Sequence, residues 1–310
     1  MRRNNRRHLL FFAATAVCLA CALSPAAAGR HAPVVQAVGD FGYIRWSSDP
    51  PRSLAMVVGR GVGAPPDGGG RALSGPLARA REQALENLLS VCMNVRVTAD
   101  STIGDAVAKD PGALAQIKEM VETARMCNRE YLSDGTVLVR MGIPLYGGLA
   151  QVVLPPTIVQ VPQVRQVQAQ RPARAEAKAV TPAGEEPEPP KTGLLVDARG
   201  LAAAPAMVPR ILDEDGREVY GPAWVSREYA VSGMCGYTRD PDRAASHPRV
   251  GENPLTVKAL SVRGEGRCDL VISNADAARL RGASENLSFL RRCGVVVLLD
   301  PATQDPWEDG

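Results

Sequence analysis

Apolar positions recur at strand or helix spacing along the first half of the chain. Leu54 to Val58 form an apolar run that is typical of a strand, and Val95 and Val97 alternate with polar residues in a shorter one. Between these two runs, Pro76 opens a segment that continues to about Cys92. Its apolar residues fall on one helical face: Leu77, Ala80, Ala84, Leu88 and Val91. The pattern predicts a helix packed on a sheet.

A second helix and a hairpin complete this half. Asp110-Pro111 supplies a cap and a first-turn proline, and the residues that follow carry an apolar stripe of Leu114, Ile117, Val121 and Ala124. Residues 128–132 and the alternating residues 137–143 flank the turn Ser133-Asp134-Gly135, as in a β-hairpin. Together these elements predict a small α/β or α+β domain.

The second half repeats this mixture. Residues 194–196, 255–262, 268–272 and 295–299 read as strands, and residues 208–212 and 218–220 form a hairpin around Asp215-Gly216. Ser273 and Ser284 cap two helices between the last two strands. Apolar strands joined through helix favour a right-handed parallel crossover. We therefore expect strands 268–272 and 295–299 to be parallel neighbours.

The two halves are separated by residues 155–192, which hold eight prolines, five glutamines and no aromatic residue. Such a composition cannot build a core and is typical of an extended spacer. The predicted fold class is thus α/β (or α+β): two small αβ domains, 29–154 and 193–310, joined by a long Pro/Gln-rich disordered linker over 155–192. Protease is expected to cut first within the linker, and the two halves are expected to fold independently.

The amino terminus has the pattern of a secretory signal peptide. Four arginines precede the apolar run from Leu9 to Leu23, and Ala26-x-Ala28 offers small residues for cleavage, so the mature chain is expected to begin at Gly29. Residues 1–28 are then the signal. Cleavage before Cys21, with a lipid on that cysteine, is the alternative. Export is expected to deliver the mature chain to an oxidising compartment outside the cytoplasm.

Removing the signal changes the formal net charge from +3 to −1, because four arginines and no acidic residue leave. A chain near neutrality lacks the cationic face that phosphate contacts require. Nucleic acid is therefore not an expected partner.

Candidate chemistry is sparse. Gly59-Arg60-Gly61-Val62-Gly63 has glycines after a strand but lacks the third glycine of a dinucleotide fingerprint, so we interpret it as a strand that bends or exits. Asp213-Glu214-Asp215-Gly216 resembles part of a calcium loop, but the required flanking carboxylates are missing. The mature chain keeps only His31 and His247 and no C-x-x-C pair, so no metal site, cofactor or catalytic residue is predicted.

The best candidate site is Ser273-Asn274-Ala275-Asp276, because open α/β sheets place ligands at the carboxyl ends of strands. The weak binding candidates are Ser273, Asn274 and Asp276. Helix capping by Ser273 and Asp276 is the competing interpretation.

Five cysteines remain in the mature chain, in a compartment where disulfides persist. If strands 268–272 and 295–299 are parallel neighbours, Cys268 and Cys293 lie at strand spacing, within reach of a disulfide. Cys92 with Cys127 is a second candidate pair, which leaves Cys235 free. The alternative is that all five stay buried thiols.

Several short motifs lie between Trp46 and Leu154. They are Gly59-x-Gly61, Ala80-Arg81-x-x-Ala84-x-x-Asn87-Leu88-Leu89, Val95-x-Val97, and Ser133-Asp134-Gly135-Thr136-Val137 followed by Ile143-Pro144-Leu145. On these motifs the segment resembles the LPP-twenty lipoprotein family and, more distantly, the amino-terminal domain of flagellar assembly protein T. The resemblance implies an envelope protein of αβ fold without known enzymatic activity, in the periplasm or associated with the outer membrane of a Gram-negative bacterium. It supplies no catalytic residues, and it implies membrane contact only if Cys21 is lipidated.

These observations predict a non-catalytic cell-envelope protein that acts by binding or assembly, with an envelope protein as partner and flagellar function and homo-oligomerisation left open. An envelope hydrolase using carboxylates in the second domain is the alternative. An enzyme should show two converging titratable groups in a cleft, whereas an assembly module should show an exposed apolar patch or sheet edge.

Overall fold

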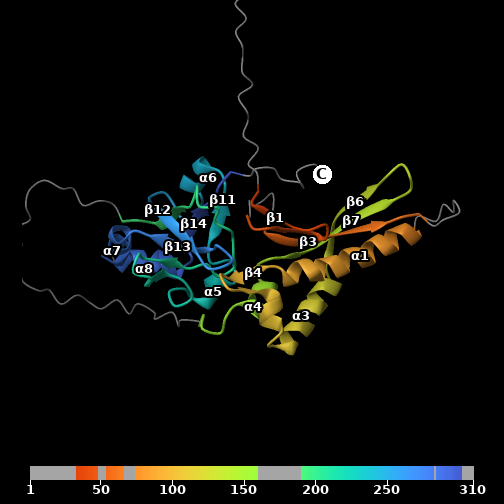
Figure 1. The fold of residues 1–310 in the computed structure, drawn as a ribbon, viewed down its shortest axis with the longest axis horizontal. Coiled ribbons are helices and arrows are strands. Elements are labelled where there is room, and N and C mark those ends of the chain that lie inside the picture. The colour runs from red at the N-terminus through yellow and green to blue at the C-terminus, as the bar shows by residue number, and fades with distance from the viewer. Residues whose placement is uncertain (1–32, 48–53, 66–73, 160–189, 283, 302–310) are drawn as a thin grey trace, which may run out of the picture. The chain divides into compact units, whose positions relative to one another are not determined.

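The computed structural model describes residues 33–47, 54–65, 74–159, 190–282 and 284–301 (Figure 1). Helices and strands are mixed throughout, which confirms the predicted fold class. The predicted signal peptide, the lipidation alternative at Cys21 and most of the predicted spacer lie outside the described residues. No described helix is both long enough and apolar enough to cross a membrane.

The N-terminal half is built on a five-stranded antiparallel sheet in the order β1-β2-β3-β7-β6. Its strands are β1 (Val35–Val38), β2 (Gly42–Arg45), β3 (Met56–Gly63), β7 (Val137–Pro144) and β6 (Arg125–Tyr131). The sequence patterns predict β3, β6 and β7, but they miss the β1–β2 hairpin, where apolar and polar positions do not alternate cleanly.

One face of this sheet is covered by the long helix α1 (Ser74–Met93), which runs along β3 and β7 (Figure 1). The predicted stripe is confirmed at Ala80, Ala84, Leu88 and Val91, which are fully buried, whereas Leu77 is partly buried against the core. The other helices of this half are α2 (Ile103–Val107), α3 (Pro111–Glu122) and α4 (Gly148–Val153). A small ribbon of β4 (Arg96–Thr98) and β5 (Ser101–Thr102) follows α1.

Helix α3 begins as the sequence predicts, with Asp110 as its cap and Pro111 in its first turn. The Asp110 carboxylate accepts hydrogen bonds from the backbone N–H groups of Gly112, at 3.0 Å, and Ala113, at 3.1 Å. Pro111 occupies the first turn, where its missing N–H costs nothing. The helix then buries Ile117 and Val121 toward the core.

The C-terminal half is a seven-stranded mixed sheet in the order β10-β9-β13-β12-β8-β14-β11. The strands are β8 (Gly193–Asp197), β9 (Ile211–Leu212), β10 (Glu218–Tyr220), β11 (Gly236–Thr238), β12 (Pro254–Arg263), β13 (Asp269–Ile272) and β14 (Val295–Leu298). The helices are α5 (Arg227–Ala230), α6 (Pro241–Ala245), α7 (Asn274–Gly282) and α8 (Ser284–Arg291).

The predicted parallel crossover from β13 to β14 is wrong. β12 and β8 lie between these two strands, and β13 runs antiparallel to β12, whereas β12 and β14 both run parallel to β8. The apolar residues of these strands are buried: Leu194, Leu195 and Val196 in β8, Leu270, Val271 and Ile272 in β13, and all of β14. An apolar run predicts burial on both faces of a sheet, but it does not say which strand is the neighbour.

The described residues belong to one compact unit, and its largest hydrophobic cluster includes buried residues from both halves. Backbone hydrogen bonds join the halves: Met207 N–H donates to Arg96 C=O at 3.0 Å, and Val208 N–H donates to Val97 C=O at 2.8 Å. At the edge of the predicted spacer, Ile158 is fully buried. The domain boundaries at 154 and 193 stay a prediction.

Candidate functional site

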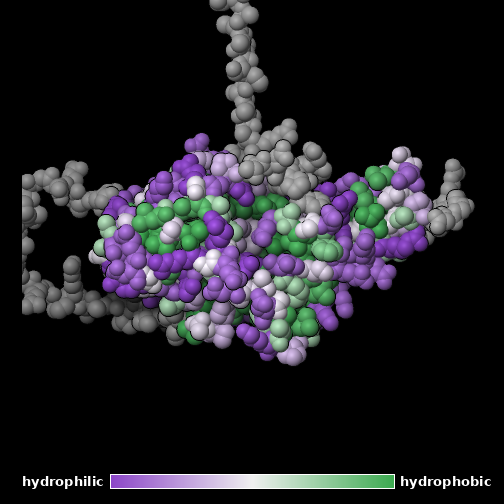
Figure 2. Space-filling model, viewed as in Figure 1, coloured by the Kyte–Doolittle hydropathy of each residue, from purple (hydrophilic) through white to green (hydrophobic). Residues whose placement is uncertain are grey.

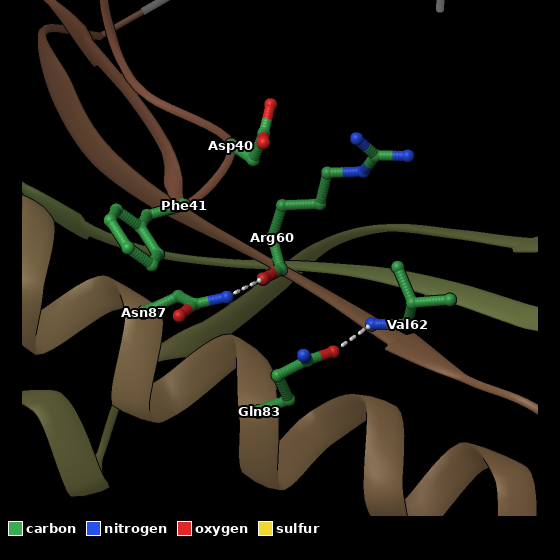
Figure 3. Close-up of a pocket in the computed structure, with 6 residues that line it drawn as sticks. All are labelled: Asp40, Phe41, Arg60, Val62, Gln83 and Asn87. Carbon is green, nitrogen blue, oxygen red and sulfur yellow. Dashed lines mark hydrogen bonds between the residues drawn. The ribbon is translucent and has the colours of Figure 1, made fainter.

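A groove lies beside β3, next to Gly42, the first residue of its neighbour β2. The last residue pair between the two strands is Gly42 with Gly59, followed by one hydrogen bond from Arg60 N–H to Phe41 C=O at 2.8 Å. Beyond Arg60, this edge of β3 has no strand beside it among the described residues. The groove has a volume of about 220 Å³ and is lined by Asp40, Phe41, Arg60, Val62, Gln83 and Asn87 (Figure 3).

The groove exists because α1 packs unusually close to β3. Gly59, Gly61 and Gly63 alternate along the strand and face the helix, and a Cβ atom on any of them would overlap the helix backbone. The carbonyl oxygens that it would meet belong to Ala84, Ala80 and Pro76, which are spaced by four residues. Two strand residues rise about 6.7 Å and four helix residues about 6 Å, so the glycine spacing and the helix spacing stay in step.

This close approach lets polar side chains of α1 reach the free edge of β3. Asn87 Nδ2 donates to Arg60 C=O at 2.7 Å, and Val62 N–H donates to Gln83 Oε1 at 2.6 Å (Figure 3). Arg79 donates to the carbonyl of Ala64. We call Arg79, Gln83 and Asn87 the edge ladder. It supplies hydrogen bonds that a neighbouring strand would otherwise make, and buried or half-buried backbone groups need such partners.

The walls of the groove combine apolar and charged groups. Phe41 is 49% exposed and Val62 is 42% exposed, so both present apolar surface to solvent. Arg60 points away from α1, with the Asp40 carboxylate on the same side (Figure 3). Hydrophobic surface accordingly appears between hydrophilic areas over the strands of this half (Figure 2). The groove thus offers an aromatic ring, an aliphatic side chain, two amides and two opposite charges. Such a lining suits a ligand that has both apolar and amide groups.

The sequence analysis only partly anticipates this site. It identifies the glycines of β3 as a strand feature and not as a nucleotide loop. It expects the strand to bend or exit there, and the structure has all three glycines within β3, which ends at Gly63. It does not single out Asp40, Phe41 or Gln83. Two matching spacings in the sequence could have indicated the site. Polar residues recur every four positions in the helix, and glycines recur every two positions in the strand.

The predicted site at Ser273, Asn274 and Asp276 is a helix cap. Asp276 N–H donates to Ser273 Oγ at 3.0 Å, and Ser273 Oγ donates to Asp276 Oδ2 at 2.8 Å. Asn274 N–H donates to the Glu214 carboxylate at 2.8 Å. The structure brings the three residues together, but their polar groups serve the start of α7 and its contact with the neighbouring turn.

The turn at Asp213 to Gly216 is held by charge. Asp213 is fully buried and accepts hydrogen bonds at 2.9 Å from both Arg217 Nε and Arg281 Nη1. Burial alone would raise the pKa of this carboxyl group. The hydrogen bonds from Arg217 and Arg281 have the larger effect together and lower the pKa to about 2. Gly216 adopts a φ of 82°, which suits glycine at a tight turn. This is a structural turn of the β9–β10 hairpin, as the sequence predicts.

Another carboxylate of the C-terminal half has an unusual environment. Burial raises the pKa of Glu218, and its buried Oε1 atom has no hydrogen-bond partner among the described residues. Arg210 and Asp269 both act on it electrostatically. Asp269 itself is 1% exposed and forms a 2.5 Å ion pair with Arg210. Within the described ranges, no group of three His, Cys, Asp or Glu residues is arranged to hold a metal ion.

The predicted disulfides are not present. Cys92, Cys127, Cys235, Cys268 and Cys293 are all free thiols in the structure. The pairing of Cys268 with Cys293 is wrong because two strands separate β13 from β14, so the two cysteines do not start neighbouring strands. Cys92 is buried in α1, whereas Cys127 is exposed on β6.

Comparison with known protein families gives a match over the C-terminal half. No curated protein matches the chain. A family model, however, matches the whole of the second sheet, and it is a bacterial family of unknown function. Residues 193–301 are thus similar to the second domain of Treponema pallidum Tp0624.

Proposed function

We propose that this protein is an exported, non-catalytic protein of the bacterial cell envelope that binds an extended segment of a partner protein in the β3 groove. The resemblance of residues 46–154 to the LPP-twenty family and to flagellar assembly protein T supports an envelope location, periplasmic or at the outer membrane. The match to a Treponema domain supports a bacterial source. Flagellar assembly is one setting in which such binding would serve.

The observation that carries this proposal is the combination of a strand edge with no strand beside it among the described residues and exposed apolar side chains. An extended peptide that binds a sheet edge gains main-chain hydrogen bonds, and it gains specificity from pockets for alternate side chains. Arg60 C=O and Val62 N–H are bonded by side chains of the edge ladder, which can rotate away. Phe41 and Val62 then contact an apolar side chain of the incoming segment.

The charges at the groove define the segment further. Arg60 and Asp40 lie together on one side of the groove (Figure 3). A partner segment with an acidic and a basic residue around one apolar residue would complement them, and such complementarity contributes mainly to specificity. The open edge of β6 is a less suitable site, because a register shift between Met126 and Asn128 interrupts the strand.

A binding selection tests this proposal. Purified protein is panned against a library of linear heptapeptides, and selected peptides are titrated against wild-type protein, Val62→Asp and Leu287→Asp. Val62 and Leu287 are 42% and 41% exposed, so the second variant is a matched control. We expect Val62→Asp to weaken binding at least tenfold and Leu287→Asp to leave it unchanged. Equal effects of both variants, or no selected peptide, would count against the groove.

The alternative function, an envelope hydrolase, has one observation in its favour. Glu218 combines a raised pKa with an orphaned buried oxygen, and general acids are tuned in this way. Its possible partner carboxylate, Asp269, is already engaged by Arg210. Incubation of the protein with peptidoglycan and with casein tests this alternative. Turnover that disappears in Glu218→Gln would favour the hydrolase over the binding protein.

A further inference from the structure

We propose that the segment bound in the β3 groove runs parallel to β3 and has small residues, such as glycine, alanine or serine, at alternate positions. This inference rests on the proposed function and adds to it a chain direction and a side-chain pattern for the partner. Three features of the groove lead to it: the main-chain groups along the edge of β3, the turn that closes one end of this edge, and the close approach of α1.

The edge of β3 presents the main-chain groups of alternate residues. Arg60 N–H donates to Phe41 C=O, so Arg60 and Val62 both direct their N–H and C=O groups toward the side of β2 and the groove. Gly61, between them, directs its main-chain groups toward β7 on the other side. The edge ladder bonds two of the groups on the groove side, Arg60 C=O and Val62 N–H, which flank Gly61.

These two bonds have the pattern that one residue of a parallel strand makes. In a parallel ladder, a residue donates its N–H to the carbonyl before the residue opposite and accepts at its C=O from the N–H after it. Asn87 Nδ2 donates to Arg60 C=O at 2.7 Å. Gln83 Oε1 accepts from Val62 N–H at 2.6 Å. The two amides thus take the places of the N–H and the C=O of a single residue opposite Gly61.

An antiparallel segment cannot replace both bonds. The N–H that it would donate to Arg60 C=O belongs to its residue opposite Arg60, and Phe41 already holds that place through its hydrogen bond from Arg60 N–H. The chain turns away there, because Phe41 N–H donates to Val38 C=O at 3.2 Å. A parallel segment instead joins the edge opposite Gly61 and runs away from this turn toward Gly63.

The approach of α1 restricts the side chains on one face of the segment. Residues directly opposite each other in a sheet point their side chains to the same face, and Gly61 and Gly63 both face α1. The segment residues opposite these glycines therefore point between the sheet and the helix, where Gln83 and Asn87 lie (Figure 3). Both amide side chains stay on this side after they release the edge, so only small residues fit beside them.

The other face of the segment has more room. The residue opposite Val62 points away from α1, as the side chains of Val62 and Arg60 do (Figure 3). Val62 is 42% exposed, so an apolar residue placed opposite it covers apolar surface of both chains. The pattern expected of the partner is therefore small, apolar, small along three successive residues.

Two synthetic peptides of equal charge test the side-chain pattern. Ser-Val-Ser-Val-Lys-Lys has small residues at alternate positions, and Leu-Val-Leu-Val-Lys-Lys has none in any register. Both are titrated against the wild-type protein, Val62→Asn and the matched control Leu287→Asn. We expect the serine peptide to bind at least tenfold more tightly than the leucine peptide, and Val62→Asn alone to weaken its binding. A groove that selected only for apolar surface would give the opposite order.

Variants of the edge ladder test the chain direction. A parallel segment displaces both amides, so Gln83→Ala and Asn87→Ala should each bind the serine peptide about fivefold more tightly than the wild type. Glu82→Ala, at an exposed position of the same helix, should not differ from the wild type. An antiparallel segment leaves the Asn87 bond in place, so tighter binding in Gln83→Ala alone would overturn the direction.

A crosslink gives the direction without any variant. A photoreactive group on the amino end of the serine peptide should label Asp40 or Phe41 in the wild-type protein, and labelling of residues 63–65 instead would overturn a parallel arrangement. Tighter binding of the leucine peptide, lost in Val62→Asn, would overturn the small-residue pattern and leave the groove as a binding site. Binding of neither peptide would also overturn the pattern, and the heptapeptide selection then decides separately whether the groove binds any segment.

Discussion

Single atoms decide the architecture beside the groove. At Gly61, one added Cβ would overlap the carbonyl oxygen of Ala80 and the backbone of Ala84. Both obstacles are helix backbone, which cannot rotate away as the end of a flexible side chain can. The separation of α1 from β3 is therefore set by the absence of side chains on alternate residues of the strand.

Gly61→Ala is expected to lower the free energy of unfolding by about 3 kcal/mol, because the helix must move away from the sheet. Gly75→Ala is the control, since Gly75 lies in α1 with no atom near the added Cβ. That substitution should be neutral or raise stability by up to about 1 kcal/mol. Urea unfolding of the two variants measures both effects, and equal stabilities would contradict the close-packing argument.

The buried carboxylate of Asp213 predicts a dependence of stability on acid. Its pKa of about 2 in the folded state lies below the value of about 3.9 in an unfolded chain. The group therefore stabilises the fold fully above about pH 5, and this contribution is lost as the pH falls through 4 toward 2. Between pH 6 and pH 2, the free energy of unfolding should fall less in Asp213→Asn than in the wild-type protein. Asp242→Asn, at an exposed position of α6, should behave as wild type.

Among the elements, helix α1 has two structural roles on adjacent faces: its apolar stripe packs on the sheet, and the edge ladder bonds the edge of β3. Its apolar stripe could be predicted from sequence because helical periodicity alone defines it. The edge ladder could not, since it depends on the register between the helix and β3, which is set by tertiary packing. The same limit explains the error at β13 and β14: each strand was predicted, but their neighbours were not.

Removal of the edge ladder should expose the edge of β3. Gln83→Ala and Asn87→Ala are each expected to cost about 1 kcal/mol, because each leaves a backbone group without its partner. The double variant should also self-associate, since a free edge templates pairing with another chain. Glu82→Ala, an exposed position on the same helix, is the control. Sedimentation of a monomeric double variant with unchanged stability would show that the ladder is dispensable.

At the scale of the whole molecule, the two halves share buried residues and backbone hydrogen bonds. The sequence indicates two αβ units from their periodicity, but contacts between them involve single residues such as Trp46 and Tyr237, whose rings pack edge to face at 6.1 Å. No periodic pattern marks such contacts. The predicted independence of the halves therefore needs a separate test.

Cleavage of the chain between residues 160 and 190 tests whether the two halves are independent. Limited proteolysis should cut there first, at Arg165, Arg171, Arg174 or Lys178, as the composition of the segment predicts. The two fragments should remain together on a gel-filtration column because of their shared core. Elution as two separate folded fragments would support independent domains and contradict the continuous core.

The central claim, that the β3 groove binds a partner segment, is tested most directly by site-specific crosslinking in cells. A photo-activatable amino acid replaces Val62 in one strain and the equally exposed Leu287 in another. The account predicts a discrete crosslinked adduct from position 62, absent at position 287 and lost when Phe41 is also replaced by aspartate. Identical adducts from both positions, or none from position 62 in a chain that folds and is exported, would contradict it.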